Sequence, residues 1–510
     1  MEHYDVIIIG SGAGGGTLAY SLAPTGKKVL ILERGGYLPR ELENWSSRAV
    51  WGDLRYRNSG RWTDGATGKA FTPKQHYYVG GNTKFYGAVL FRMRERDFGA
   101  VTHVDGISPE WPITYADLEP YYTRAEQLYS VHGERKVDPF DPPASGPYPH
   151  PPVSDEPRIA QLRGDLERAG LRPFWLPMGI MIDEDHPERS ACIRRATCDG
   201  FPCLVNAKAD AHVVCVEPAL RHPNVTLLTH ANVSRLETSD DGRRVTGVAV
   251  ERNGVAERYT ADLVVVAAGA INSAALLQRS ACDKHPNGLA NGSGLVGRNL
   301  MLHNNSSLIA FSKEPNPTRF EKTLGINDFH YGDGRWDYPL GAMQMLGRSD
   351  AFTISLDAPD DPDPARLAEH ALDFWLTTED LPKAQNRVEA HADGAITLHY
   401  SPSNLDAHQR LIATFKGLLE SMQCRNEVRE MPHYLGGKLG VSAVAHQNGT
   451  MRFGHDPATS VLDVNCKAHE LDNLYVADSS FFVSSSAVNP TLTIIANALR
   501  IGDHLAERLS

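Results

Sequence analysis

The stretch VIIIGSGAGG, residues 6–15, places an apolar run directly before a G-x-G-x-x-G turn. The apolar run predicts a buried strand of a parallel sheet, and Gly12 to Ala23 predicts the helix that follows it. Gly10 permits the tight turn, Gly12 lets a pyrophosphate approach the backbone, and Gly15 allows the helix to pack closely on the strand. The stretch therefore predicts a dinucleotide-binding βαβ unit, with the pyrophosphate at the positive end of the helix.

Glu33 follows the second predicted strand of this unit, Lys28 to Leu32. It stands about 20 residues beyond the glycine turn, which is the spacing of a carboxylate that binds both hydroxyls of a ribose. Such a carboxylate disfavours a 2′-phosphate. The loop-rich stretch that follows, to about Gly81, has little periodicity, and a long loop of this kind usually covers a ligand.

The middle of the chain predicts an antiparallel meander that leads into a parallel strand. Turn residues at 240–242 and 253–254 separate its short apolar runs. The runs are Thr226 to Thr229, Val245 to Glu251 and Glu257 to Tyr259. After them, Leu263 to Gly269 is unbroken and apolar, as in a strand that is buried on both faces. Upstream of the meander, Tyr115 to Val131 predicts a helix that is capped by Thr114.

Asp478 ends the last predicted strand, which begins at Leu474, and Thr491 to Leu505 predicts the final helix. In a doubly wound flavoprotein, a strand at this place returns to the sheet and puts its polar end beside the ribityl chain and the pyrophosphate. The alternative role of Asp478 is a helix cap or a turn.

Length and charge limit the classes of function. A chain of 510 residues exceeds a single ordinary domain, so two lobes are expected. Its 51 Lys and Arg against 62 Asp and Glu give a net charge of −11, which argues against nucleic acid or an anionic membrane as a partner. No basic leader precedes the first strand, and the apolar runs are too short for a membrane helix. We therefore expect a cytoplasmic protein.

The seven cysteines form an odd, scattered set that is typical of a reducing compartment. Cys192, Cys198 and Cys203 form a C-x5-C-x4-C array, and His212 is a conceivable fourth ligand. Structural zinc takes four ligands, typically in paired C-x2–4-C spacing, which this array lacks. We expect free thiols and no metal site.

Motifs at both ends of the chain resemble the glucose–methanol–choline (GMC) oxidoreductase family, and the resemblance is weakest between about 300 and 440. The glycine turn with Glu33-Arg34-Gly35-Gly36 resembles the start of the family's FAD-binding region. The other similar segments are Tyr78 to Gly87, Trp111 to Tyr115 with Tyr121-Tyr122, Ala268 to Ser273, His446 to Thr450, and Val488 to Thr491.

This resemblance implies an α/β fold, in which a Rossmann-like FAD-binding domain is interleaved with an α+β substrate-binding domain that carries an antiparallel sheet. The FAD-binding domain would comprise residues 1–100, 201–303 and 455–510, and the substrate-binding domain residues 101–200 and 304–454. The implied FAD-binding residues are Gly10, Gly12, Ala13, Gly14, Gly15, Glu33, Arg34, Gly80, Gly81, Asn82, Thr83, Tyr86, Gly87, Val233, Ala268, Gly269, Asp478, Asn489, Pro490 and Thr491.

The pair His446 and Asn489, in place of two histidines, resembles the sugar-oxidising branch of the family, typified by pyranose oxidases and bacterial glycoside 3-oxidases. Pyranose oxidases have a Thr-His-Trp segment whose histidine is bonded covalently to FAD. Here the corresponding segment reads Lys84-Phe85-Tyr86. Because phenylalanine cannot form that bond, we expect dissociable, non-covalent FAD.

His446 and Asn489 also suit alcohol oxidation on chemical grounds. The reaction removes a hydride from carbon, which passes to flavin N5, and a proton from the hydroxyl. A neutral imidazole such as His446 is an efficient base for that proton. The Asn489 carboxamide can hold the same hydroxyl and orient the C–H bond. The alternative for His446 is an ordinary structural histidine.

The leading hypothesis is FAD-dependent oxidation of a secondary hydroxyl of a sugar or glycoside, at C3 or C2, to a ketone. Molecular oxygen would accept the electrons and yield hydrogen peroxide. One alternative is a dehydrogenase with another electron acceptor, for instance in the biosynthesis of aminoglycosides or other natural products. Another is a lyase, because some family members use the same histidine to cleave hydroxynitriles while FAD is a spectator. An oligomer is compatible with the sequence.

Two further features stay open at this point. His303 lies either near the flavin or in a structural role. The Tyr and Trp side chains between residues 51 and 62 either stack on a sugar ring or pack the interface between the lobes.

Overall fold

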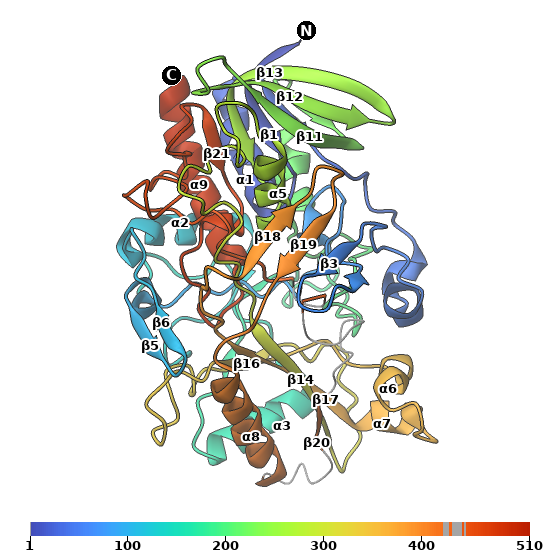
Figure 1. The fold of residues 1–510 in the computed structure, drawn as a ribbon. Helices are drawn as coiled ribbons and strands as arrows, with labels where there is room; N and C mark the ends of the chain where they lie inside the picture. Colours follow the sequence, from blue (N-terminus) through green and yellow to red (C-terminus); the bar gives the residue numbers. More distant parts are fainter. Residues whose placement is uncertain (1, 422–427, 431–440, 443–444) are drawn as a thin grey trace.

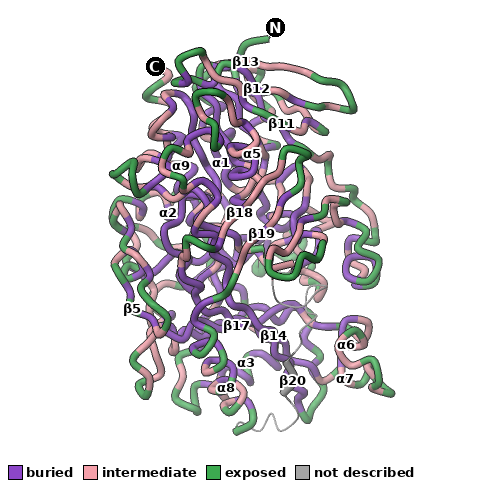
Figure 2. Tube along the Cα trace, in the orientation of Figure 1, coloured by how far each residue is buried: buried purple, intermediate pink, exposed green. Residues whose placement is uncertain are grey.

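Two large sheets form the two ends of the molecule in the computed structural model, which describes residues 2–421, 428–430, 441–442 and 445–510 (Figure 1). A seven-stranded sheet lies at the end that holds both termini, and a six-stranded sheet lies at the other. A four-stranded sheet lies between them. Buried segments run through the middle of the molecule and connect the two ends (Figure 2).

The seven-stranded sheet has the order β10-β2-β1-β13-β12-β11, and β21 pairs with β13. Its strands are β1 (His3–Ile9), β2 (Val29–Leu32), β10 (Val225–Leu228), β11 (Ala231–Thr238), β12 (Val245–Arg252), β13 (Val255–Val266) and β21 (Leu474–Val476). The pairings among β10, β2, β1, β13 and β21 are parallel, so the carboxyl ends of these strands meet at one edge. This arrangement confirms the predicted α/β, Rossmann-like fold.

Three helices expected from the sequence pack on one another, and the first of them, α1, contacts β1 and β2 of this sheet. Helix α1 (Ala13–Leu22) packs against α9 (Thr491–Leu509), and α9 packs against α2 (Tyr115–Leu128). Thr114 caps α2 as predicted, because its hydroxyl accepts a hydrogen bond from the N–H of Asp117 at 3.3 Å. Helix α2 ends three residues before the predicted Val131, which instead begins β7 (Val131–His132). The last helix continues beyond the predicted Leu505.

Strand β13 belongs to two kinds of sheet at once. Residues 255–259 pair antiparallel with β12, and residues 260–266 pair parallel with β1. The prediction that residues 226–229 start the meander is wrong, because β10 is a parallel edge strand beside β2. The meander starts at β11, where a bulge between Val233 and Arg235 interrupts the period-two pattern that would have identified it.

The six-stranded sheet is antiparallel, with the order β20-β14-β17-β16-β15-β8. Its strands are β8 (Phe174–Trp175), β14 (Asn304–Phe311), β15 (Leu324–Ile326), β16 (Ala342–Met345), β17 (Ala371–Thr378) and β20 (Val428–Glu430). Helix α8 (Leu405–Ser421) packs on β14 and β17 through a stripe that includes Leu411, Phe415 and Leu419. Helix α3 (Pro157–Arg168) contributes Ile159 and Leu162 to the same core.

The remaining elements connect the two large sheets. The four-stranded sheet pairs β3 (Trp62–Asp64) and β4 (Ala70–Phe71) with β18 (Arg387–Ala390) and β19 (Ile396–His399). It therefore joins a segment of each predicted domain, and the domain boundaries stay a prediction. The other elements are β5 (Val101–His103), β6 (Gly106–Ser108), β9 (Met178–Gly179), α4 (Glu217–Ala219), α5 (Ala270–Arg279), α6 (Ala351–Asp357) and α7 (Pro364–His370). None of the described helices has the length and apolar character needed to span a bilayer.

The glycine turn and the start of α1 approach the ends of two strands, β21 and β13, at backbone contact distance. A Cβ on Gly14 would lie 1.6 Å from the Ala477 carbonyl oxygen, just beyond β21. A Cβ on Gly10, whose φ is +105°, would lie 2.4 Å from the Ala267 carbonyl oxygen, just beyond β13. A Cβ on Gly12 would meet nothing within 4 Å. Gly10 and Gly14 are therefore packing residues, while Gly12 faces open space.

We predict that Gly14→Ala destabilises the fold whereas Gly12→Ala does not. Alanine gains about 1 kcal/mol of helix propensity over glycine, but the clash at position 14 exceeds this and should leave a net loss of about 2 kcal/mol or more. Gly12 has φ −70° and ψ −163°, which alanine adopts without strain. Urea unfolding of the two cofactor-free variants, followed by circular dichroism, checks this. Equal midpoints would contradict the packing described here.

Candidate active site

A cavity lies at the carboxyl edge of the seven-stranded sheet, where β1, β2, β13 and β21 end. The residues predicted from the sequence that line it are Gly10, Gly12, Ala13, Gly14, Glu33, Arg34, Gly81, Asn82, Thr83, Tyr86, Gly87, Val233, Ala268, Gly269, His446, Asp478, Asn489, Pro490 and Thr491. Gly15 and Gly80 are not part of this lining. Gly15 packs on the backbone of Gly10, and Gly80 donates its N–H to Ser11 Oγ at 3.2 Å.

Glu33 is fixed at the end of β2 beside the glycine turn. Its Oε2 accepts hydrogen bonds from the N–H of Ser11 at 3.1 Å and from the Ser11 hydroxyl, and its Oε1 accepts from the N–H of Gly35 at 2.9 Å. Burial raises the pKa of the Glu33 carboxyl, and these hydrogen bonds oppose that rise. The carboxylate is thus held in one position at the cavity wall, where a ribose would meet it.

Two guanidinium groups face the same part of the cavity. Arg34 lies over the ring of Tyr77, 4.3 Å from its centroid, and Arg279, at the end of α5, also lines the cavity. The pKa of Arg279 is lowered by burial and further by the charge of Arg34, so the two cations are close. Such a pair attracts an anion such as a diphosphate. Arg279 was not predicted from the sequence.

Asp478 links the end of β21 to the start of α5. Its Oδ2 accepts hydrogen bonds from the N–H of Gly269 at 2.9 Å and from the Ser273 hydroxyl, and its Oδ1 accepts from the N–H of Ser480 at 2.9 Å. Burial raises the pKa of the Asp478 carboxyl, against these bonds. Asp478 lines the cavity and also caps the turn at Ser480, so its alternative role as a cap is confirmed. Its place beside the ribityl chain and the pyrophosphate stays a prediction.

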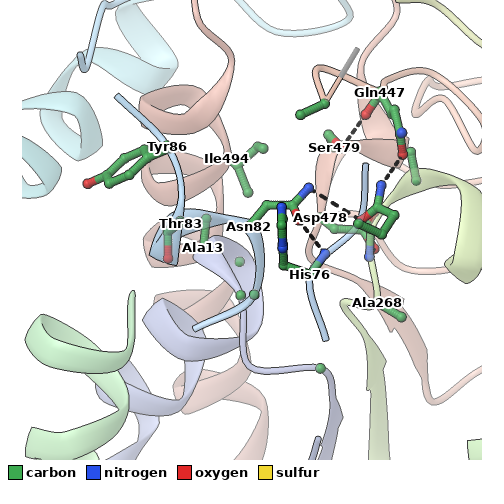
Figure 3. A pocket seen from close by; sticks show the side chains of 18 of the residues that line it. Ala13, His76, Asn82, Thr83, Tyr86, Ala268, Gln447, Asp478, Ser479 and Ile494 are labelled. Atoms are coloured by element: carbon green, nitrogen blue, oxygen red, sulfur yellow. Dashed lines mark hydrogen bonds between the residues drawn. The ribbon is translucent and has the colours of Figure 1, made fainter. Parts of the chain in front are cut away.

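The segment 76–87 forms one wall of the cavity and is pinned by side-chain hydrogen bonds. The N–H of His76 donates to Asn82 Oδ1 at 2.9 Å, and the N–H of Ala211 donates to Thr83 Oγ1 at 3.0 Å. Figure 3 shows His76 and Asn82 together, with Gln447 beside Ser479, whose hydroxyl donates to the Gln447 carbonyl at 2.6 Å. Phe85 stacks on the ring of His76 at a centroid distance of 3.6 Å. The wall is therefore a fixed surface.

The two histidines His446 and His303 are in direct contact. Their Nδ1 atoms lie 2.8 Å apart, and His303 Nε2 lies 3.2 Å from the Ser485 carbonyl oxygen. Desolvation lowers the pKa of both imidazoles, that of His446 well below its usual value, so both are neutral at neutral pH. His303 thus contacts His446, which lines the cavity, whereas its nearness to the flavin stays a prediction.

The tautomers of this pair follow from the Ser485 carbonyl, which only accepts hydrogen bonds. His303 must therefore carry its proton on Nε2, which leaves its Nδ1 as an acceptor. His446 then carries its proton on Nδ1 and donates it to His303. Consequently His446 Nε2 holds a lone pair, and no described residue donates a hydrogen bond to it. This lone pair is available to a ligand in the cavity.

Asn489 is held in one amide orientation. Its Nδ2 donates to the Val89 carbonyl at 3.4 Å, and its Oδ1 accepts from Gln344 Nε2 at 3.3 Å. The second hydrogen on Nδ2 remains for a ligand. Gln344, at the centre of β16, lines the cavity, and its buried Oε1 has no hydrogen-bond partner among the described residues. This oxygen is an acceptor for a ligand hydroxyl.

Other features of the sequence lie outside the cavity. Trp51 and Tyr56 are buried and pack on Phe201 and Phe85, respectively, so they are packing residues of a small hydrophobic cluster. Cys192, Cys198 and Cys203 are unpaired, and no cluster of three or more metal-ligating side chains is found in the described part of the chain. Cys424 lies outside the described residues.

Sequence comparisons identify related proteins along the whole chain. Residues 177–305 and 382–498 match two domains described as GMC oxidoreductase, and residues 5–48 match an FAD binding domain. The 6'''-hydroxyparomomycin C oxidase of Streptomyces lividus is 32% identical, in an alignment that covers 99% of this chain and 92% of the length of that oxidase. The paromamine 6'-oxidase of Streptomyces fradiae is 32% identical and covers 98% of this chain and 90% of its own.

A solved structure supports the fold. A formate oxidase of Aspergillus oryzae RIB40 aligns with a TM-score of 0.70 over 100% of this chain and 99% of its own, at 17% identity. The cavity also fits FAD on its own geometry. Gly12 faces open space at the positive end of α1, Glu33 ends β2, and the Arg34–Arg279 pair offers positive charge to a diphosphate.

Proposed function

Since the chain belongs to the GMC oxidoreductase family, we propose that it uses FAD to oxidise a secondary hydroxyl of a sugar or glycoside, at C3 or C2, to a ketone. The observation that carries this proposal is the lone pair of His446 Nε2. No described residue donates a hydrogen bond to it, and His446 lines the same cavity as the glycine turn. The 32% identical relatives, both named as oxidases of aminoglycosides, support a sugar-derived substrate.

The glycine turn, Glu33 and Asp478 would hold the dinucleotide part of FAD, and the segments 81–87 and 489–491 would line its flavin end. Bound there, FAD would supply the hydride acceptor for the carbinol carbon. The protein must then take the hydroxyl proton and hold the C–H bond in one orientation.

His446 Nε2 takes the proton in this proposal. The imidazole is neutral before the reaction, because burial lowers its pKa, so the base form is present at neutral pH. His303 keeps the lone pair on Nε2 of His446, because His303 accepts a hydrogen bond from Nδ1 of His446. The His303 ring is itself held by its hydrogen bond to the Ser485 carbonyl. The free N–H of Asn489 holds the same hydroxyl oxygen, and Gln344 Oε1 accepts a hydrogen bond from a neighbouring hydroxyl.

The proposal also covers the electron acceptor and the way in which FAD is held, with or without a covalent bond to the protein. The names of the two relatives support molecular oxygen as the electron acceptor, with hydrogen peroxide as its product. Phe85, at the position of the covalent histidine in pyranose oxidases, stacks on His76 and offers no nucleophile. This supports FAD that is bound without a covalent link.

The FAD should leave the protein on denaturation. After acid precipitation and centrifugation, we expect the flavin absorbance in the supernatant, because no bond ties it to the polypeptide. Flavin that stays in the pellet would contradict this expectation. His76, which also lines the cavity, would then be the first residue to examine by peptide mapping.

Sugars and glycosides should bleach the flavin. Anaerobic mixing with a panel of both is expected to remove the visible absorbance of the oxidised flavin, and aerobic turnover should give one hydrogen peroxide per ketone at C3 or C2. Turnover with an unbleached flavin would favour the lyase. Bleaching with reduction of an artificial dye but no peroxide would favour a dehydrogenase. An aldehyde as product would move the site of oxidation to a primary hydroxyl, as in the 6' position named for one relative.

Removal of the base should slow flavin reduction without loss of FAD. In His446→Ala we expect the anaerobic rate constant to fall by about 10³-fold, as for removal of a general base. His303→Gln should retain more activity than His303→Phe, because a carboxamide can accept from His446 Nδ1 and donate to Ser485, as the imidazole does. His455→Ala, at an exposed histidine, is the control. Equal rates in His303→Gln and His303→Phe would refute the tautomer assignment.

A further inference from the structure

Lys74 is a buried lysine that lines the cavity, with 6% of its surface exposed. Its ammonium nitrogen lies 5.4 Å from the centroid of the Trp51 ring. Within the described part of the chain, no carboxylate, carbonyl or hydroxyl accepts a hydrogen bond from it. A buried ammonium without an oxygen partner is costly, so its presence at a cavity calls for an explanation.

The other buried lysines show how a buried ammonium group is otherwise paired in this protein. Lys84 donates to Asp210 at 2.8 Å, and Lys322 lies 3.3 Å from Asp199. Lys208 donates to three carbonyl oxygens, those of Tyr86, Cys198 and Phe201. Each of these three lysines therefore has at least one oxygen acceptor, which distinguishes Lys74 from them.

The charged groups around Lys74 do not balance the positive charge of its ammonium form. Burial lowers the pKa of Lys74, and the nearby Arg57 lowers it further. Asp199, which lines the same cavity, opposes this effect, but Asp199 already pairs with Lys322. The surroundings therefore favour an additional negative charge, which would restore the ammonium form.

Lys74 lies at the part of the cavity where the proposed chemistry takes place. Lys74 and His446 line the same cavity, and the ammonium form of Lys74 would lower the pKa of His446. The adjacent Gln75 donates a hydrogen bond from its amide to Gln447, the residue after His446. The backbone of Lys74 is thus tied to the segment that carries the base.

We propose that Lys74 forms a subsite for a carboxylate of the substrate, beside the hydroxyl that is oxidised. The inference rests on the proposed function only in placing the substrate in the cavity of His446. An ammonium nitrogen with three free donors binds a carboxylate through charge-assisted hydrogen bonds. A substrate with an amino group at this place would instead meet a like charge. The chemical class favoured here is a sugar acid or a glycoside that bears a carboxylate.

The test uses the FAD-loaded protein and two small probes of equal shape, acetate and acetamide. Binding is followed by the change that each probe causes in the visible spectrum of the oxidised flavin, so it needs no turnover. In the wild type, acetate should bind more tightly than acetamide. In Lys74→Met, we expect acetate to bind about tenfold more weakly, whereas acetamide should bind as before. Lys74→Arg keeps the positive charge and should keep acetate binding.

The matched control is Lys28→Met, at an exposed lysine that precedes β2, at the edge of the sheet opposite to the cavity. It should bind both probes as the wild type does. Equal affinity of the wild type for acetate and acetamide would overturn the subsite, as would unchanged acetate binding in Lys74→Met. A defect of Lys74→Met confined to the reaction of dithionite-reduced protein with oxygen would also overturn it. Loss of acetate binding in Lys74→Met, with no sugar or sugar acid bleaching the flavin, would support the subsite and reject the proposed function.

Discussion

The close approach of the glycine turn and helix α1 to the ends of β13 and β21 is the constraint on which the rest of the structure depends. It is possible only because Gly10 and Gly14 have no side chain toward the carbonyl oxygens of Ala267 and Ala477. Those two carbonyls follow strands that lie more than 200 residues apart in the sequence. The glycines therefore bring the first, middle and last parts of the chain to one edge of one sheet. The cavity is a consequence of this contact.

Around that edge there are two sets of polar groups. One set is already hydrogen-bonded within the protein, and the other has hydrogen-bonding capacity that remains for a ligand. Glu33 and Asp478 have their carboxylate oxygens held by backbone and hydroxyl donors. By contrast, His446 Nε2 and Gln344 Oε1 have no hydrogen-bond partner among the described residues. In the proposed function, groups of the first kind would hold the cofactor, and groups of the second kind would bind the substrate. The fold thus supplies the rigidity, and the reaction would take place at the groups it leaves unpaired.

Much of this arrangement could be predicted from the sequence where local pattern carries the information. The glycine turn, Glu33 and the last strand have fixed spacings, so the α/β fold and the part of the cavity lining at Gly10 to Gly14, Glu33 and Asp478 could be predicted from them. The rest of the predicted lining was implied by the resemblance to the family. The meander was misassigned at residues 226–229, because a short apolar run does not show whether its neighbours are parallel or antiparallel. Family resemblance brought His446 and Asn489 together although 43 residues separate them in the chain.

The remaining site residues carry no local signal. Lys74 belongs to a loop without periodicity, and Gln344 is one polar residue in an otherwise apolar strand. Arg279 ends a helix, where a basic residue is common for electrostatic reasons alone. Their position depends on tertiary packing of the second sheet and the loops against the first. Only the fold shows that these side chains face the same cavity as the glycine turn.

The most direct test of the central claim is a crystal structure of the protein with FAD and a sugar substrate or inhibitory analogue bound. The account predicts that the hydroxyl to be oxidised lies within hydrogen-bond distance of both His446 Nε2 and Asn489 Nδ2, with its carbon facing flavin N5. It also predicts that the Nδ1 atoms of His446 and His303 remain in contact. A hydroxyl bound away from His446, or a His446 ring turned so that Nε2 bonds to the protein, would contradict the account.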